Sequence, residues 1–133
     1  MYTDKIAVIS FDLKTADMAA PPGDNTDLFS ILIPTSREIE VQAMRAHVRL
    51  ASDGADFIEL VKENNTVITK VALVATGKVS GVNSDGTTAT TFPQRVAAQS
   101  TTAVSLLKLR TDGALDATTE VTVQVHLSGL MAQ

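Results

Sequence analysis

The sequence predicts an all-β domain of about eight short strands, arranged as a sandwich or a barrel. Its strongest signal is that apolar residues recur at every second position, which is the periodicity of a strand that buries one face. The clearest case is segment 120–127, EVTVQVHL, in which valines and a leucine alternate with polar residues. Turn-forming residues separate such segments, and no segment has a convincing helical period.

Three other segments are predicted strands for similar reasons. Segments 5–13, KIAVISFDL, and 103–110, AVSLLKLR, each place apolar residues on one face and polar residues on the other. Segment 28–33, LFSILI, is apolar almost throughout and is typical of a buried strand. Prolines before and after this third segment separate it from its neighbours.

Segment 38–50, EIEVQAMRAHVRL, alternates in two halves whose phases differ by one residue. A β-bulge at Ala43–Met44 would absorb the extra residue and keep both halves facing the core. A helix is the alternative, but the spacing favours a strand. The residues expected to face the core are Ile39, Val41, Ala43, Met44, Ala46, Val48 and Leu50.

Segment 55–77, ADFIELVKENNTVITKVALVATG, predicts a hairpin that turns at Asn64-Asn65, because asparagine tolerates the left-handed region. Three Asp-Gly pairs predict further reversals, at Asp53-Gly54, Asp85-Gly86 and Asp112-Gly113. The register of the hairpin stays open. The core would receive Phe57 or Ile58, Leu60, Val67 or Ile68, and Val71 or Leu73.

The 133 residues suit one domain spanning 1–133. Two polar connections stand out within it: residues 14–26, expected to form an extended arm or loop, and residues 78–102, expected to form a long polar loop. The chain has no cysteine, so it can form neither a disulfide framework nor a thiolate zinc site. This composition suits assembly in a reducing cytosol.

Composition also narrows the classes of partner. A formal net charge of −4, 4 % aromatic residues and the lack of a Lys/Arg run disfavour nucleic-acid binding. Segment 1–14 is unlike a signal peptide, and no apolar run approaches the ~20 residues that cross a bilayer. We therefore expect neither a nucleic acid nor a membrane among the partners.

The sequence predicts no catalytic, cofactor-binding or metal-binding residues. His47 and His126 are the two histidines, and neither has a His or Asp at ligand spacing. Acids occur in segment 52–56, SDGAD, and at Asp85, but without the twelve-residue calcium loop they are better interpreted as turns. Neither a Gly-x-Ser-x-Gly nucleophile motif nor a phosphate-binding glycine loop is present.

Seven residues are candidates for contacts with other subunits: Met18, Pro21, Pro22, Arg45, His47, Arg49 and His126. Arg45, His47 and Arg49 share one face of the expected strand. That face is either a solvated polar surface or a basic stripe that meets an acidic partner or a neighbouring copy. His126 lies on the polar face of the last strand, and the other three give the 14–26 connection apolar and stiff elements.

One family resemblance extends these predictions. Segment 31–74, ILIPTSREIEVQAMRAHVRLASDGADFIELVKENNTVITKVALV, resembles small jelly-roll proteins of tailed bacteriophage virions. The likeness consists of one strand followed by one hairpin, and the final strand, TTEVTVQVHL, also fits. The matching residues are Gly54, Phe57, Ile58, Leu60, Asn65, Thr66 and Ile68.

The resemblance implies a jelly-roll-like antiparallel β-sandwich with a structural, non-enzymatic role and no cofactor. Related virion proteins serve as capsid decoration (cement) subunits, usually trimeric, or as tail and fibre modules. We therefore expect a homotrimer that binds the major capsid protein on the outside of the head shell, within the virion. The alternative is a tail, baseplate or fibre module that binds host glycans. A cupin-type enzyme has a similar shape but would need clustered metal-binding histidines.

Overall fold

The computed structural model describes residues 7–33, 38–54, 56–97, 99 and 104–129. In these ranges the one helical element is a short 3-10 turn, η1 (Thr15–Asp17), and no helix is long and apolar enough to cross a membrane. The strands are β1 (Ala7–Lys14), β2 (Asp27–Ile33), β3 (Ile39–Leu50), β4 (Phe57–Lys62), β5 (Val67–Ala72), β6 (Gly77–Ser80), β7 (Gln94–Val96), β8 (Ser105–Asp112) and β9 (Glu120–Ser128).

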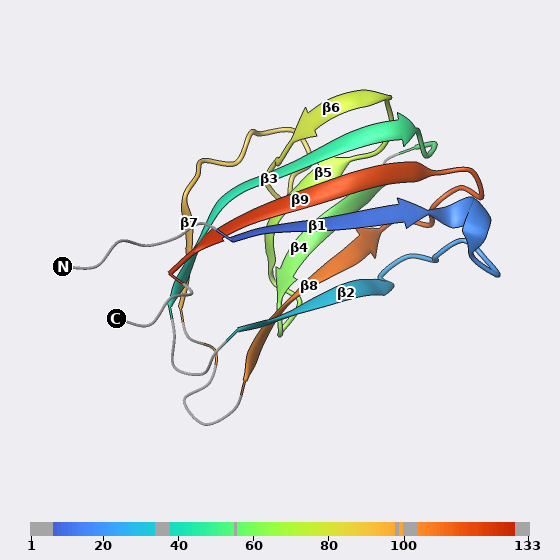
Figure 1. Cartoon of the computed structure of the whole chain (residues 1–133). Helices are drawn as coiled ribbons and strands as arrows, with labels where there is room; N and C mark the ends of the chain where they lie inside the picture. Colours follow the sequence, from blue (N-terminus) through green and yellow to red (C-terminus); the bar gives the residue numbers. More distant parts are fainter. Residues whose placement is uncertain (1–6, 34–37, 55, 98, 100–103, 130–133) are drawn as a thin grey trace.

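The strands form two antiparallel sheets that pack against each other (Figure 1). Sheet A has the order β1-β9-β3-β6, and the short strand β7 also pairs with β3. Sheet B has the order β2-β8-β4-β5. Apart from β7 and the β4–β5 hairpin, successive strands lie in different sheets. Early strands lie beside late ones, β1 beside β9 and β2 beside β8, which is the strand order of a jelly roll. The predicted jelly-roll-like β-sandwich is therefore confirmed.

The core lies between the sheets because the strands bury alternate side chains. In β9 the valines and Leu127 are buried, whereas Thr122 and Gln124 lie on the outer face. In β8 the buried residues alternate with half-buried ones in the same way. The bulkiest fully buried side chains are Ile39, Met44, Ile58, Leu60, Leu73, Leu107, Leu109 and Leu127.

The bulge predicted in β3 is confirmed, one residue before its predicted position at Ala43–Met44. The pairing of β3 with β9 shifts between Val41 and Ala43, so Gln42 is the extra residue. Ala43 and Met44 are consecutive, and both are buried. The Gln42 side chain donates a hydrogen bond from Nε2 to the hydroxyl of Ser128 at 2.8 Å, which ties the bulge to β9.

The expectation that Leu50 faces the core is wrong. A second shift in the pairing of β3 with β9 falls between Val48 and Leu50, at the end of the strand. Val48 is buried, whereas Leu50 is 48 % exposed. The alternation therefore ends two residues earlier than the sequence pattern predicts, because the strand is irregular where it enters the next turn.

The structure gives the register of the hairpin formed by β4 and β5. Asn65 has a φ of 68°, and its N–H donates to the Lys62 carbonyl at 2.8 Å, so the asparagine turn is confirmed. Phe57 lies on the outer face of sheet B, and Val67 and Ile68 are only half-buried. The hairpin residues buried in the main core are Ile58, Leu60, Val71 and Leu73.

The three Asp-Gly pairs do mark reversals. Gly54 has a φ of 75°, Gly86 of 78° and Gly113 of 101°. Residues with a side chain rarely adopt these values, so glycine is required where the chain turns. The three turns lie between β3 and β4, between β6 and β7, and between β8 and β9.

The two polar connections are more ordered than the sequence suggests. Residues 14–26 form a packed loop rather than a free arm: Thr15 donates to the Asp116 carbonyl at 2.7 Å, and the Pro22 carbonyl accepts from the Leu115 N–H at 3.0 Å. Residues 78–102, expected to be a long loop, contain most of β6 and all of β7. Both strands pair with β3, so this connection supplies one edge of sheet A.

Candidate functional site

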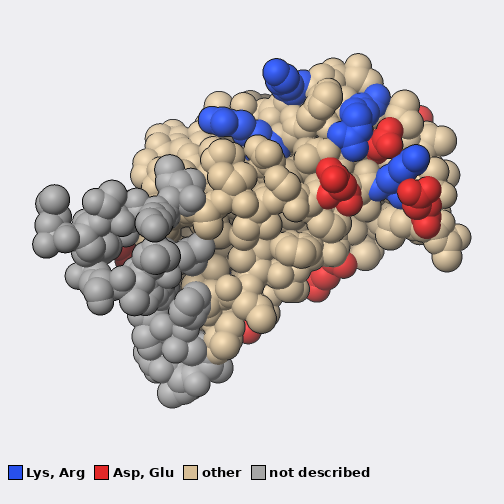
Figure 2. Space-filling view, viewed as in Figure 1, with Lys and Arg blue, Asp and Glu red and all other residues tan. Residues whose placement is uncertain are grey.

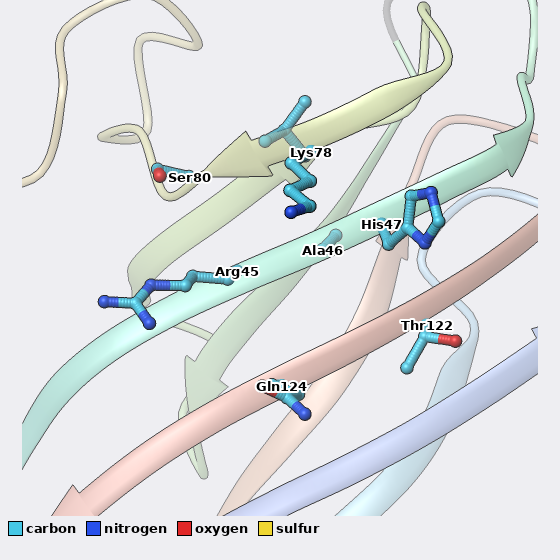
Figure 3. A pocket seen from close by; sticks show the side chains of 8 residues that line it. Arg45, Ala46, His47, Lys78, Ser80, Thr122 and Gln124 are labelled. Atoms are coloured by element: carbon cyan, nitrogen blue, oxygen red, sulfur yellow. The ribbon is translucent and has the colours of Figure 1, made fainter.

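The main candidate site is a depression on the outer face of sheet A, over the centre of β3 (Figure 3). Its volume is about 480 Å³. We call its polar lining the basic face. The basic face consists of Arg45, His47, Lys78, Ser80, Thr122 and Gln124.

Strand register places the basic face in two rows that cross three strands. Arg45 of β3 lies opposite Ser80 of β6 and Gln124 of β9. The next row has His47 at its centre, with Lys78 on the β6 side. Rows of outward side chains in a strand are about 6.6–6.8 Å apart. The polar groups therefore stand on a rigid sheet rather than on loops.

The cations of the basic face have no acidic partner within the described residues. Neither Arg45 nor Lys78 forms an ion pair or a side-chain hydrogen bond there, and the same is true of the His47 ring. Figure 2 shows lysine and arginine gathered on part of this side of the molecule. The described cations that do form ion pairs are Lys14, Arg49, Lys70, Arg95, Lys108 and Arg110.

Arg49 belongs to the rim of the basic face and not to its unpaired centre. Its Nη1 donates to Thr122 Oγ1 at 2.7 Å, and its Nε lies 3.9 Å from a carboxylate oxygen of Glu120. Thr122 in turn donates to Asp12 at 2.5 Å. The residues predicted to share this face are therefore changed. Arg45 and His47 share it with Lys78, which sequence reasoning missed, and Arg49 faces acids.

The two histidines do not converge. His47 lies opposite Thr122, whereas His126 lies opposite Val8 and Ala43, two rows further along β9. The Nε2 atom of His126 is buried and has no hydrogen-bond partner in the described part of the chain. Within the same residues, no three His, Cys, Asp or Glu side chains form a group that could hold a metal ion.

The remaining candidate contact residues lie in the connection between β1 and β2. Met18 and Pro21 are exposed, but Pro22 is buried and its side chain is not on the surface. Met18 lines a second depression of about 500 Å³, which Arg49 also lines. Its lining contains three acids and two bases, so it lacks the uncompensated positive charge of the basic face.

The outer face of sheet B contrasts with the basic face because its charges are paired internally. Glu59 is 3 % exposed and accepts from Arg110 Nε at 2.7 Å. Burial raises the pKa of Glu59 above its ordinary value of 4.5, and the Arg110 guanidinium opposes that rise. Lys70 lies 2.8 Å from an Asp112 carboxylate oxygen and 4.0 Å from the centre of the Phe57 ring.

Asp85 has a structural role in its turn. The N–H groups of Thr87 and Thr88 each donate to Asp85 Oδ1 at 2.9 Å, and the Thr88 hydroxyl donates to Oδ2 at 2.6 Å. These bonds, led by the Thr88 hydroxyl, lower the pKa of Asp85 from 3.8 to about 2. All of these donors come from the turn itself, as the interpretation of Asp85 as a turn residue requires.

Replacing Thr88 with alanine is expected to raise the pKa of Asp85 toward 3.8, because the strongest hydrogen bond to the carboxylate is lost. In the wild type, the ionised carboxylate contributes stability that is fully present above pH 3.8 and is lost as the pH falls through about 2. NMR titration of the Asp85 carboxyl carbon measures both values. Thr87→Ala is the control and should change the pKa much less; equal shifts in both variants would contradict this account.

Comparison with known proteins adds no relative. No protein-family model matches the chain, and no curated protein matches its sequence. The likeness to virion proteins therefore rests on the residue pattern of segments 31–74 and 118–127 alone.

Proposed function

We propose that the protein is a structural subunit of a tailed-bacteriophage virion that binds the outside of the head shell as a homotrimer and stabilises it. The observation that carries the proposal is the jelly-roll strand order, which is the fold that the resemblance implies. The hairpin quoted for the resemblance is β4 and β5, and Ile58, Leu60, Val71 and Leu73 of this segment are buried in the core. This segment is therefore part of the β-sandwich itself.

Stabilisation of a shell requires several contacts at once. A trimer that touches more than one coat subunit converts later binding events into intramolecular ones, so modest single contacts add up to a high overall affinity. Such a subunit binds the closed shell better than separated coat proteins, and it therefore favours the closed state by mass action. No covalent bond is made or broken in this process.

The edge formed by β1 and β2 supports the trimer part of the proposal. Each of these strands ends its sheet, and no described strand pairs with its free edge. Leu32 is 69 % exposed and Val8 is 50 % exposed. Phe11 of β1 and Phe29 of β2 pack against each other with ring centres 5.5 Å apart. Unpaired edges flanked by apolar side chains are surfaces that a second copy can cover.

Light scattering coupled to size exclusion is expected to give three times the 14.0 kDa mass of one chain. Leu32→Glu should shift the protein toward monomer, because the charge would be buried between copies. Val74→Glu is the matched control, since Val74 is similarly exposed but lies in the turn between β5 and β6. A wild-type monomer at high concentration, or a Leu32→Glu trimer, would contradict the proposed self-contact.

The shell part is tested with empty heads assembled from the major capsid protein of the virus that encodes the chain. Wild-type protein should sediment with the heads at saturable stoichiometry and should raise the temperature at which they open. Free protein of the same concentration should stay in the supernatant without heads. Absence of co-sedimentation would overturn the proposal.

The glycan-binding alternative has less support in the geometry. Saccharide sites commonly present an exposed aromatic ring on which a sugar stacks. Among the described phenylalanines, Phe29 is 38 % exposed but packs against Phe11 at a tilt of 37°, Lys70 covers Phe57, and Phe92 packs against the core. None of these rings stands on the outer face of sheet A, where the candidate site lies.

A further inference from the structure

We propose that the basic face is the surface that meets the shell, and that the shell presents carboxylate side chains to it. This inference rests on the proposed function and adds the contact surface and the chemistry of the partner. It concerns Arg45 and Lys78 first, because these two side chains carry positive charge without an acidic neighbour in the described residues.

Charge is the first argument. The chain carries a formal net charge of −4, so an average patch of its surface is expected to be acidic. Arg110 of sheet B is paired with Glu59, and Lys70 with Asp112, whereas the cations over the centre of sheet A are unpaired. A local positive surface on an acidic protein attracts an acidic partner and repels other copies of the same face.

Geometry is the second argument. Lys78 lies directly opposite His47, and Arg45 is two residues before His47 on the same strand. Arg45 and Lys78 are therefore diagonal neighbours, about 7–8 Å apart at Cα. Two carboxylates at alternate positions of an extended segment are about 6.6–6.8 Å apart, so one such segment can reach both cations. Arginine can bind its carboxylate through two parallel hydrogen bonds.

The sheet also holds the backbone of the basic face in place before binding. β3 is held by β9 over nearly its whole length, and β6 pairs with β3 from Arg45 to Val48. The backbone under the cations is therefore ordered before a partner arrives, and this lowers the entropy lost on association. Ser80 and Gln124 flank Arg45 and can hydrogen-bond a carboxylate that the guanidinium holds.

A protein surface fits this face better than a polyanion. Asp12 and Glu120 lie beside the basic face on the β1 side and would repel a long anionic chain there. The unpaired positive charge is thus confined to the part of sheet A formed by β3 and β6. Its size suits two or three carboxylates with defined positions, and such an arrangement is what the folded surface of a shell can present.

The test measures binding of charge-reversed subunits to the same empty heads. Arg45→Glu and Lys78→Glu should each weaken binding about tenfold or more, because each places a carboxylate against carboxylates. Lys62→Glu is the matched control: it changes the net charge equally, but it lies at the end of β4 in sheet B. The control should bind like the wild type. Wild-type binding should weaken as salt rises, and the variants should be less sensitive to salt.

The outcomes separate this inference from the proposed function. If the wild type does not bind heads, the proposed function fails and the inference fails with it. If the wild type binds and both reversed variants bind equally well, the inference alone is overturned. If the reversed variants lose their trimer in light scattering, the basic face contacts another copy and the inference is again overturned. Trimeric variants that bind weakly, beside a normal Lys62→Glu control, support it.

Discussion

Arg110→Met is expected to destabilise the fold by about 3–5 kcal/mol, because it leaves a buried carboxylate without its cation. Glu59 is 3 % exposed, Arg110 donates from Nε to its Oε1, and Arg110 Nη2 forms an ion pair with the same oxygen. Lys70 lies opposite Glu59 on the other side but is engaged with Asp112. Urea unfolding followed by circular dichroism measures the loss; the chain has no tryptophan to report it by fluorescence.

The loss should depend on pH in a defined direction. Burial raises the pKa of Glu59 above 4.5, so folding favours its protonated form, and its contribution to stability falls as the pH rises through the raised pKa. Removing Arg110 removes the main opposing influence and raises the pKa further. The deficit of Arg110→Met should therefore be largest at neutral pH and should shrink as the pH falls toward 4.5.

Arg95→Met is the matched control for this experiment. Arg95 also pairs with a glutamate, Glu38, but the two side chains are 71 % and 49 % exposed. An exposed pair contributes about 0–1 kcal/mol, so the control should stay close to the wild type. Equal losses in Arg95→Met and Arg110→Met would show that burial of Glu59 does not govern the result.

Gly113→Ala is the second change with a large expected effect, about 2–5 kcal/mol. Gly113 has a φ of 101°, which disfavours any side chain. An added Cβ would lie 2.2 Å from Asp56 Oδ1 and 3.3 Å from Asp56 Cα, so Asp56 would have to move. Asp56 accepts from the Ser52 hydroxyl at 2.6 Å, and the Gly113 N–H donates to Asp24 at 2.8 Å. The change therefore disturbs three loops at once.

Gly77→Ala separates backbone strain from collision. Gly77 has a φ of 118°, and an added Cβ would meet nothing within 4 Å. This control should therefore cost only the backbone term of about 1–2 kcal/mol. Urea unfolding of both variants gives the difference between them, which is the cost of displacing Asp56. If both variants lose the same stability, the packing of Asp56 against Gly113 contributes nothing.

The long strands could be predicted because burial of one face imposes the same period on all of them. The consecutive buried pair Ala43 and Met44 also revealed the bulge in β3, since no regular strand buries two neighbours on one face. The short strands β6 and β7 were missed. They have only 4 and 3 residues, too few for a period to show. They form because β3 extends along sheet A and its free edge needs hydrogen-bond partners.

The candidate site was predictable only in part. Arg45 and His47 are two residues apart, so their common face follows from the strand period alone. Lys78 joins them through the register of β3 and β6, which no local pattern encodes. For the same reason Glu59 resembles an ordinary outward-facing acid in the sequence. Its burial depends on Lys70 and Arg110, which flank it from β5 and β8.

The position of β9 in sheet A determines when the protein can finish folding during its synthesis. β9 lies between β1 and β3, and Ala7 to Lys14 of β1 pair with it along the whole strand. The ribosome releases β1 and β3 long before Glu120–Ser128, so the edges that pair with β9 lack their hydrogen-bond partners until β9 is made. Pairings so distant in sequence form slowly. A nascent chain therefore stays incompletely folded until β9 emerges.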